Sequence, residues 1–308
     1  HNARRARSGI VNIVGDQATW HRPFDAPLTA DTDALARTVS AWVRSGSATP
    51  RLGADAAAAV AAAKTWPGQI ATLILPADVS WQDGGAVGAV VEPAPPAPLD
   101  PHAIDIAARW LREHRDVLLL VGGAAVLDEG QRWAWRLAAA SGAALRAGYT
   151  AAHLARGRGR APIERVPYAM SAALQALAPY KHVILVGATP AVGFFGYPGE
   201  PSSQHPVDAQ FHVLARPEQD VVAAMRALSE AIGAPDVAPP DPGPRPSPAH
   251  GAPSPDGLAQ TVAALLPEHA IVADESVSFG RGFYRHTHAA PAHDWLHLAG
   301  GAIGDGMP

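Results

Sequence analysis

The chain has 308 residues, a length typical of about two domains. Hydrophobic residues make up 48% of the sequence and charged residues 17%, which excludes a wholly disordered chain. The net charge of −4 disfavours nucleic acid or an anionic membrane surface as the main partner. The absence of cysteine excludes disulfide frameworks, thiolate zinc sites, iron–sulfur clusters and a cysteine nucleophile. Apolar runs fall short of the roughly 18 residues of a membrane helix, and the N-terminus lacks a signal-peptide pattern, so we expect a cytoplasmic protein.

The first segment, residues 1–92, is predicted to form an α/β domain. Apolar strands are expected at 10–14 and 70–75, and helices at 33–43 and 54–64. Short, wholly apolar strands that alternate with helices are typical of a parallel sheet covered on both faces. The chain starts within what looks like the end of a helix and stops in a glycine-rich turn, so we expect a fragment of a longer protein.

The second segment, residues 99–234, repeats this pattern after a stiff, proline-rich connector at 90–98. Its predicted elements are helices at 104–115, 129–141 and 220–232 and strands at 117–121, 182–186 and 211–214. Such alternation predicts a central, Rossmann-like α/β domain with an open parallel sheet.

Residues 235–253 are rich in proline and are predicted to form an exposed linker. The third segment, residues 254–308, has an expected helix at 256–266 and an expected strand at 270–273. It looks like the beginning of another α/β domain. The predicted fold class is therefore α/β, with successive open parallel-sheet domains and helices on both faces.

Two features of the sequence are compatible with a nucleotide site and a metal site, but each has a simpler explanation. Gly122-Gly123 follows a strand, but it lacks the G-x-G-x-x-G spacing of dinucleotide-binding proteins and favours a tight strand-to-helix turn. Four histidines fall in a stretch that looks rich in loops: His286, His288, His293 and His297. Because this stretch lacks H-E-x-x-H and acidic partners at helical spacing, exposed or hydrogen-bonding histidines are expected and no metal ligand is assigned.

Polar residues follow the last predicted strand, at Asp274–Ser278. Ligands bind at the carboxyl ends of strands in parallel α/β sheets, and hydroxyls with free main-chain N–H groups suit a phosphate. A helix cap by Ser276 or Asp274 is an equally good explanation. Residues 298–308 then carry four glycines around Ile303, which would allow the backbone to approach a ligand closely.

Together these motifs resemble the thiamine-diphosphate-dependent 2-oxo-acid enzymes, in particular the acetolactate synthase large subunit and benzoylformate decarboxylase group. The most specific pair is IVADESVSFGR at 271–281 and LAGGAIGDGMP at 298–308, which occur at the separation expected in the family. The resemblance implies that 1–92 is the C-terminal part of a pyrimidine-binding domain. It also implies that 254–308 begins the diphosphate-binding domain.

The resemblance also implies roles for single residues. Ser276, Val277 and Ser278 would hold the diphosphate, with Val277 contributing main-chain groups only. The carbonyl of Gly301 would accept a hydrogen bond from the aminopyrimidine. Ile303 would be the apolar wedge that keeps thiamine diphosphate bent, unless it is an ordinary core residue.

The catalytic residue is unknown, because the glutamate of the family lies upstream of residue 1. Asp16 follows a turn glycine at a position that faces the thiazolium end of the cofactor in the family, and a turn former is an equally weighted alternative. Magnesium is implied, with its ligands outside this chain. Gly304-Asp305-Gly306 imitates the family's magnesium motif, but its context differs, so Asp305 is not assigned as a ligand.

The resemblance implies thiamine-diphosphate-dependent decarboxylation of a 2-oxo acid with carboligation, in the transferase and lyase classes. Plain decarboxylation is the alternative. It is less favoured because Gly193-Phe194-Phe195-Gly196 stands where decarboxylases of the group can place a histidine. A non-catalytic nucleotide-binding relative is a third possibility, and FAD is not expected. The isolated fragment is expected to be inactive, and the complete enzyme to be a homodimer or homotetramer with sites shared between subunits.

Overall fold

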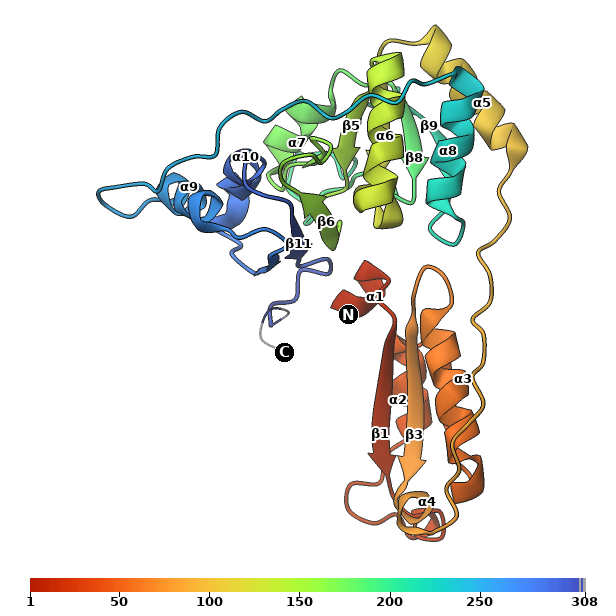
Figure 1. Cartoon of the computed structure of the whole chain (residues 1–308). Coiled ribbons are helices and arrows are strands. Elements are labelled where there is room, and N and C mark those ends of the chain that lie inside the picture. The colour runs from red at the N-terminus through yellow and green to blue at the C-terminus, as the bar shows by residue number, and fades with distance from the viewer. Residues whose placement is uncertain (305, 307–308) are drawn as a thin grey trace. The chain divides into compact units, whose positions relative to one another are not determined.

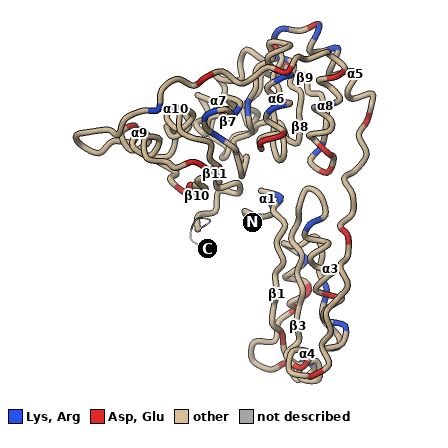
Figure 2. Tube along the Cα trace, in the orientation of Figure 1, with Lys and Arg blue, Asp and Glu red and all other residues tan. Residues whose placement is uncertain are grey.

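The chain forms two compact units, His1–Pro96 and Ala97–Pro308, called here the N-terminal and C-terminal units (Figure 1). The computed structural model describes residues 1–304 and 306, apart from the side chain of Arg281. None of the helices described there is long and apolar enough to cross a membrane. Residues of both charge signs are interspersed over each unit (Figure 2).

The N-terminal unit is built on a three-stranded parallel sheet with the order β1-β3-β2. Its strands are β1 (Ile10–Asp16), β2 (Trp42–Ser45) and β3 (Ile70–Pro76). Its helices are α1 (Asn2–Ala6), α2 (Thr32–Val39), α3 (Leu52–Lys64) and α4 (Ala77–Trp81). The strands predicted at 10–14 and 70–75 and the helix predicted at 54–64 are thus confirmed, with ends shifted by one or two residues.

The helix predicted at 33–43 is wrong at its C-terminal end. Helix α2 begins after Asp31, whose carboxylate accepts a hydrogen bond from Ala34 N at 3.0 Å, and it ends at Val39. Ser40 is extended, and its hydroxyl lies 2.6 Å from that of Thr72 on β3. The next residues, beginning with Trp42, pair with β3 as strand β2, because aromatic and β-branched side chains suit a strand beside an apolar neighbour.

The C-terminal unit contains a five-stranded, wholly parallel sheet with the order β7-β5-β4-β8-β9. Its strands are β4 (Val117–Val121), β5 (Ala144–Ala147), β7 (Glu164–Arg165), β8 (His182–Val186) and β9 (Gln210–Ala215). Its helices are α5 (Pro101–Glu113), α6 (Asp128–Ser141), α7 (Met170–Leu177) and α8 (Val221–Ile232). The predicted α/β class with parallel sheets and flanking helices is confirmed.

Alternate residues of β4 enter two different cores. Val117, Leu119 and Val121 pack with residues of α5, α6 and α8, whereas Leu118 and Leu120 pack with residues of α7. A strand that is buried on both faces needs apolar side chains at every position, which explains its uninterrupted run of Val and Leu.

A second sheet of the C-terminal unit has the order β10-β11-β6. It consists of β10 (Ile271–Asp274), β11 (His293–His297) and β6 (His153–Arg156), and the helices beside it are α9 (Pro255–Leu265) and α10 (Phe283–Thr287). β10 and β11 are parallel, but β6 joins β11 antiparallel, which departs from the predicted all-parallel sheets. The predicted domain boundaries at 99, 234 and 254 stay predictions.

Residues 235–253 contain no helix or strand, and neighbouring side chains hold this segment in place. Trp135 Nε1 donates to the carbonyl of Ala238 at 3.2 Å, and Arg158 forms an ion pair with Asp241 at 2.6 Å. Arg245 Nε donates to the carbonyl of Ala263 at 3.0 Å, at the end of α9. The segment is therefore tethered to the C-terminal unit at several points.

Candidate functional site

The candidate site lies at the carboxyl edge of β10 and β11, where the two predicted motif blocks meet. β10 and β11 are neighbours in register from Ile271 and Asp294 to Asp274 and His297. The exit loop, residues 274–278, leaves β10 at this edge, and the glycine-rich segment, residues 298–304 and 306, leaves β11. The carboxylate of Glu275 accepts a hydrogen bond from Gly306 N at 3.1 Å and joins the two.

The carboxylate of Asp274 organises the exit loop. It accepts hydrogen bonds from Ser276 N at 2.9 Å, from the Ser276 hydroxyl and from Trp295 Nε1 at 2.9 Å. Gly280 N donates to the carbonyl of Ser276 at 2.7 Å, which closes the turn. The helix cap considered for Ser276 and Asp274 is not formed, because the next helical turn begins at Gly280 without a side-chain cap.

The predicted diphosphate-binding residues differ in how available they are. The Ser276 hydroxyl is turned towards Asp274, and Val277 N donates to the carbonyl of Glu275 at 2.8 Å. Val277 is 53% exposed and Ser278 is exposed. The loop therefore offers the Ser278 hydroxyl to solvent and keeps that of Ser276 in the internal network.

A buried cationic and aromatic cluster lies beneath the exit loop. Arg156 on β6 is 3% exposed, and its Nη2 lies 2.9 Å from His297 Nε2 on β11. The guanidinium carbon lies 4.6 Å from the ring centre of Trp295 and 5.1 Å from that of Tyr284. Burial lowers the pKa of Arg156 to about 9, and burial together with nearby arginines holds the pKa of His297 far below its usual value. His297 is therefore neutral, and its Nε2 can accept from Arg156.

The four C-terminal histidines were expected in a loop-rich stretch, which is wrong for His286, His293 and His297, whereas His288 lies in a turn. His286 lies in α10, His288 directly follows it, and His293 and His297 begin and end β11. His293 is 0% exposed, and its Nδ1 lies 2.7 Å from the carbonyl of Pro291. The alternation of His293, Trp295 and His297 on the buried face of a short strand is the sequence signal that was missed.

The glycine-rich segment packs against an aromatic side chain of another segment. Gly301 has φ +75°, and a Cβ at this position would overlap the ring of Phe194. Phe194 in turn contacts the rings of Tyr149, Tyr168 and Phe195. Glycine is therefore required at 301 for both its backbone conformation and its close contact. The sequence spacing contained no signal for this contact.

Ile303 is 78% exposed, so it is not a core residue of this unit. A large apolar side chain that is held out into solvent from a glycine-rich turn is available to a ligand. Asp305 lies outside the described residues.

Asp16 ends β1 in the N-terminal unit and is engaged with its own loop. Its Oδ1 accepts a hydrogen bond from Gln17 N at 2.8 Å, and its Oδ2 forms an ion pair with Arg22 Nη2 at 2.6 Å. The Asp16 side chain is 14% exposed. This geometry suits a residue that orders the turn after β1.

Gly122 and Gly123, considered above as a nucleotide site, form the turn after β4. Gly122 N donates to the carbonyl of Val186 at 2.9 Å, and a Cβ at Gly122 would come within 2.9 Å of the carbonyl of Gly187. A 3-10 turn, Gly123–Val126, follows. The glycine pair therefore permits the close approach of two main-chain turns at the ends of β4 and β8.

Known proteins were compared with the chain by sequence and by fold. No model of a protein family matches it. It is 44% identical, over 309 aligned residues and its entire length, to "Putative acetolactate synthase large subunit IlvX" of Mycobacterium tuberculosis. The chain spans 59% of the length of that relative.

Solved structures show the same fold at low sequence identity. A thiamine diphosphate-dependent 4-hydroxybenzoylformate decarboxylase of Rhodococcus jostii RHA1 superposes with a TM-score of 0.78 at 18% identity, over 100% of this chain and 62% of its own. A "putative thiamin diphosphate-dependent enzyme" of Mycobacterium smegmatis gives 0.75 at 20% identity, over 99% and 62% of the two chains. The chain is therefore similar in sequence, over its whole length, to an acetolactate-synthase-like protein, and it has the fold of thiamine-diphosphate-dependent enzymes.

Proposed function

We propose that the chain takes part in thiamine-diphosphate-dependent decarboxylation of a 2-oxo acid, followed by ligation of the product to a second carbonyl compound. The 44% identity to an acetolactate-synthase-like protein over the whole chain supports this reaction. The observation that carries the proposal is the contact between Glu275 and Gly306, because it joins the exit loop to the glycine-rich segment. These are the two blocks on which the family resemblance depends.

The residues at this edge fit the proposed cofactor. Ile303 is exposed, as a wedge between the two rings of the cofactor must be, whereas the ring of Phe194 covers the α-carbon of Gly301, so that Gly301 would contribute only its carbonyl group. Thiamine diphosphate, when bound, supplies the electron sink for the decarboxylation. Ile303 would hold the cofactor in its bent conformation, and the carbonyl of Gly301 would accept a hydrogen bond from the aminopyrimidine.

The exit loop would hold the diphosphate through the exposed Ser278 hydroxyl, and through Ser276 and the main chain of Val277 once these groups release Asp274 and the carbonyl of Glu275. Two carboxylates, Asp274 and Glu275, lie in the same loop and would repel a diphosphate. A divalent cation such as magnesium would offset that repulsion. Trp295 and the buried Arg156 fix the loop from below, so that the diphosphate meets a preorganised surface.

Plain decarboxylation of an aromatic 2-oxo acid is the second candidate. Phe194 lies directly against Gly301, and its ring contacts those of Tyr149 and Tyr168, so this ring cluster offers a surface for an aryl group of the substrate. Product analysis of the complete gene product separates the two reactions. Pyruvate converted to a five-carbon hydroxy acid supports carboligation, whereas benzoylformate converted to benzaldehyde without ligation supports the second candidate.

The role of Ile303 can be tested by calorimetric titration of the complete gene product with thiamine diphosphate and magnesium. Ile303→Ala should weaken binding by about tenfold or more, equivalent to about 1.4 kcal/mol. Ile271→Ala is the matched control, because Ile271 is 72% exposed on β10 of the same unit and should leave the affinity unchanged. Equal affinities of wild type and Ile303→Ala, with both proteins folded, would contradict the wedge.

The assembly is proposed to be a homodimer or homotetramer in which subunits share sites. Sedimentation of the complete gene product tests this proposal, and a monomer at catalytic concentrations would contradict it.

A further inference from the structure

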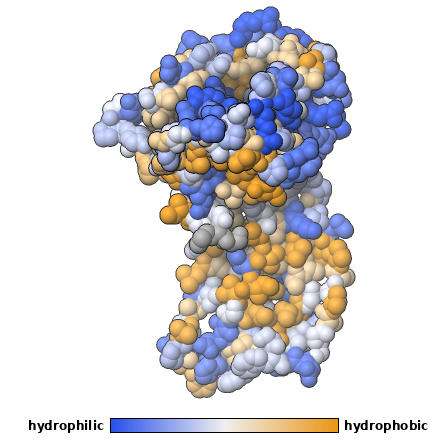
Figure 3. Space-filling view, turned by 60° about the vertical axis from the view of Figure 1, so that its left-hand side comes forward, coloured by the Kyte–Doolittle hydropathy of each residue, from blue (hydrophilic) through white to orange (hydrophobic). Residues whose placement is uncertain are grey.

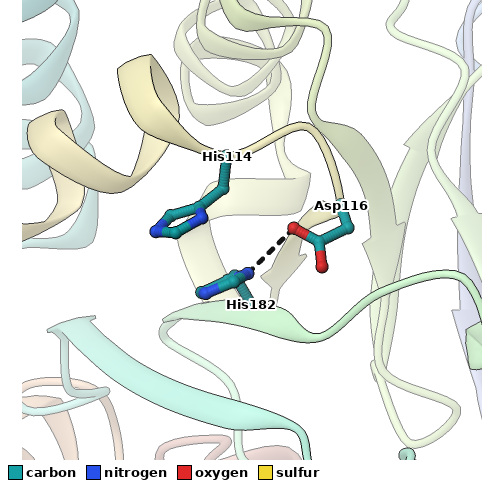
Figure 4. Close-up of side chains that lie close together, drawn as sticks. All are labelled: His114, Asp116 and His182. Carbon is teal, nitrogen blue, oxygen red and sulfur yellow. Dashed lines mark hydrogen bonds and ion pairs between the residues drawn. The ribbon is translucent and has the colours of Figure 1, made fainter.

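A second polar cluster lies on the C-terminal unit, away from the candidate site. His114 follows α5, Asp116 precedes β4 and His182 begins β8 (Figure 4). One ligand-capable atom from each of these side chains lies within 4.8 Å of the other two. His182 Nδ1 is 2.8 Å from Asp116 Oδ1, and the rings of His114 and His182 are stacked with centres 3.6 Å apart.

The fold holds these side chains in place. His182 N donates to the carbonyl of Asp116 at 3.3 Å, and the parallel ladder between β4 and β8 begins at the next pair, Val117 and His182. The ring of Trp110 packs edge-on against both imidazoles, with ring centres 5.1 Å from His182 and 6.4 Å from His114. The three residues are half-buried, so the cluster is ordered and still accessible to solvent.

The chemistry of the three groups is that of a metal site. Two imidazole nitrogens and one carboxylate oxygen suit zinc, cobalt or nickel, and imidazoles bind metal in their neutral form. The nearby cation of Lys181 is paired with Asp208 at 2.5 Å, which leaves the carboxylate of Asp116 as the acidic ligand.

The cluster lies at the amino ends of β4 and β8, whereas ligands in parallel α/β sheets bind at the carboxyl ends. The candidate thiamine diphosphate site lies on the other sheet of this unit, at the carboxyl edge of β10 and β11. We propose that His114, Asp116 and His182 bind one divalent transition-metal ion of the zinc class, with water completing the coordination. The ion cross-links the loop between α5 and β4 to the start of β8, and this site is independent of the proposed thiamine diphosphate site.

Titration of the metal-free full chain with Zn²⁺, followed by calorimetry, tests the proposal. We expect saturable binding of one ion per chain, weakened by about tenfold or more in His114→Gln, Asp116→Asn and His182→Gln. His212→Gln is the matched control. His212 packs against the same Trp110 with ring centres 5.6 Å apart, but its Nε2 faces the carbonyl of Ala103. The His212→Gln variant therefore lacks a neighbouring histidine but keeps all three proposed ligands, and it should bind Zn²⁺ as wild type does.

Titration of wild type with Co²⁺ gives a second measurement that does not depend on variants folding. Visible absorption bands typical of nitrogen and oxygen coordination, with shifts of the His114 and His182 ring signals in NMR spectra, would support the site. Absence of Zn²⁺ binding would overturn the proposal. Binding that is equally strong in wild type and in the three ligand variants would also overturn it, because the bound Zn²⁺ would then belong to other surface histidines. Ring signals of His114 and His182 that do not respond to metal would overturn it as well.

Discussion

The two units build their parallel sheets in the same way but cover them differently. Every residue of β4, the middle strand of the C-terminal unit, is buried between helices on both faces. In the N-terminal unit β3 is buried, but β1 is an edge strand on which Ile13 is 70% exposed and Val11 is 37% exposed. Hydrophobic side chains are visible on the surface of that unit (Figure 3). The same sequence pattern thus describes a fully covered sheet and a partly open one.

Substitutions on the two strands should therefore differ strongly in their effect on stability. Leu119→Ala on β4 should lower the free energy of unfolding of the C-terminal unit by about 2–5 kcal/mol, because it leaves a cavity in a closed core. Ile13→Ala on β1 is the matched change and should cost about 0.5 kcal/mol or less. Denaturant unfolding followed by circular dichroism measures both. Equal costs would mean that Ile13 is buried in solution.

The pH dependence of stability should also separate the two units. Burial lowers the pKa of His205, His288, His293 and His297 in the C-terminal unit. The unfolded chain takes up protons at these histidines below about pH 6.5 and the folded chain does not, so the stability of this unit should fall as the pH drops from 7.5 to 5.

The N-terminal unit should resist this change. Hydrogen bonds from the hydroxyl and N–H of Thr19 lower the pKa of Asp78, so its contribution persists at pH 5 and is lost only below about pH 4, as the pH falls towards the lowered pKa. Unfolding curves measured from pH 7.5 down to about pH 3 cover both effects. His205→Gln removes one of the buried imidazoles, and an unchanged pH slope in that variant would contradict the assignment to His205.

Wholly apolar strands could be predicted from the sequence, and strands that mix polar and apolar residues could not. The strands at 117–121 and 182–186 were predicted at their observed bounds, because burial on both faces requires an uninterrupted apolar run. β2 was missed because its Trp and Val continue the apolar spacing of the helix before it. The alternation of β11 was hidden because histidines, usually polar, occupy its buried positions.

The same contrast holds for the candidate site. The family resemblance paired 271–281 with the glycine-rich segment by their separation in the sequence, but strand β11, which brings the two segments together beside β10, was not predicted. The hydrogen bond between Arg156 and His297 joins residues 141 positions apart. The contact of Phe194 with Gly301 likewise joins two segments that are distant in the sequence. Neither contact leaves a local pattern, so both required the tertiary structure.

The smallest expected effect concerns the acidic residues that end β1 and β10. Asp274 is held by Trp295 and Ser276, whereas Asp16 is held by Gln17 N and by Arg22, whose side chain is 36% exposed. Asp16→Asn keeps an oxygen acceptor for Gln17 N and loses the charge that pairs with Arg22. It should lower the stability of the N-terminal unit by about 1 kcal/mol or less.

Arg22→Gln breaks the same ion pair from the other side and is the control. If Asp16 orders its loop, the two variants should lower stability alike and leave turnover of the complete gene product within a few-fold of wild type. If Asp16 instead acts on the reaction, Asp16→Asn should lower turnover by about tenfold or more, or about 1.4 kcal/mol of barrier, while Arg22→Gln does not. The bonds of Asp16 to its own loop favour the first outcome, because a carboxylate held by two neighbours of its own turn is poorly placed to take a proton from a substrate.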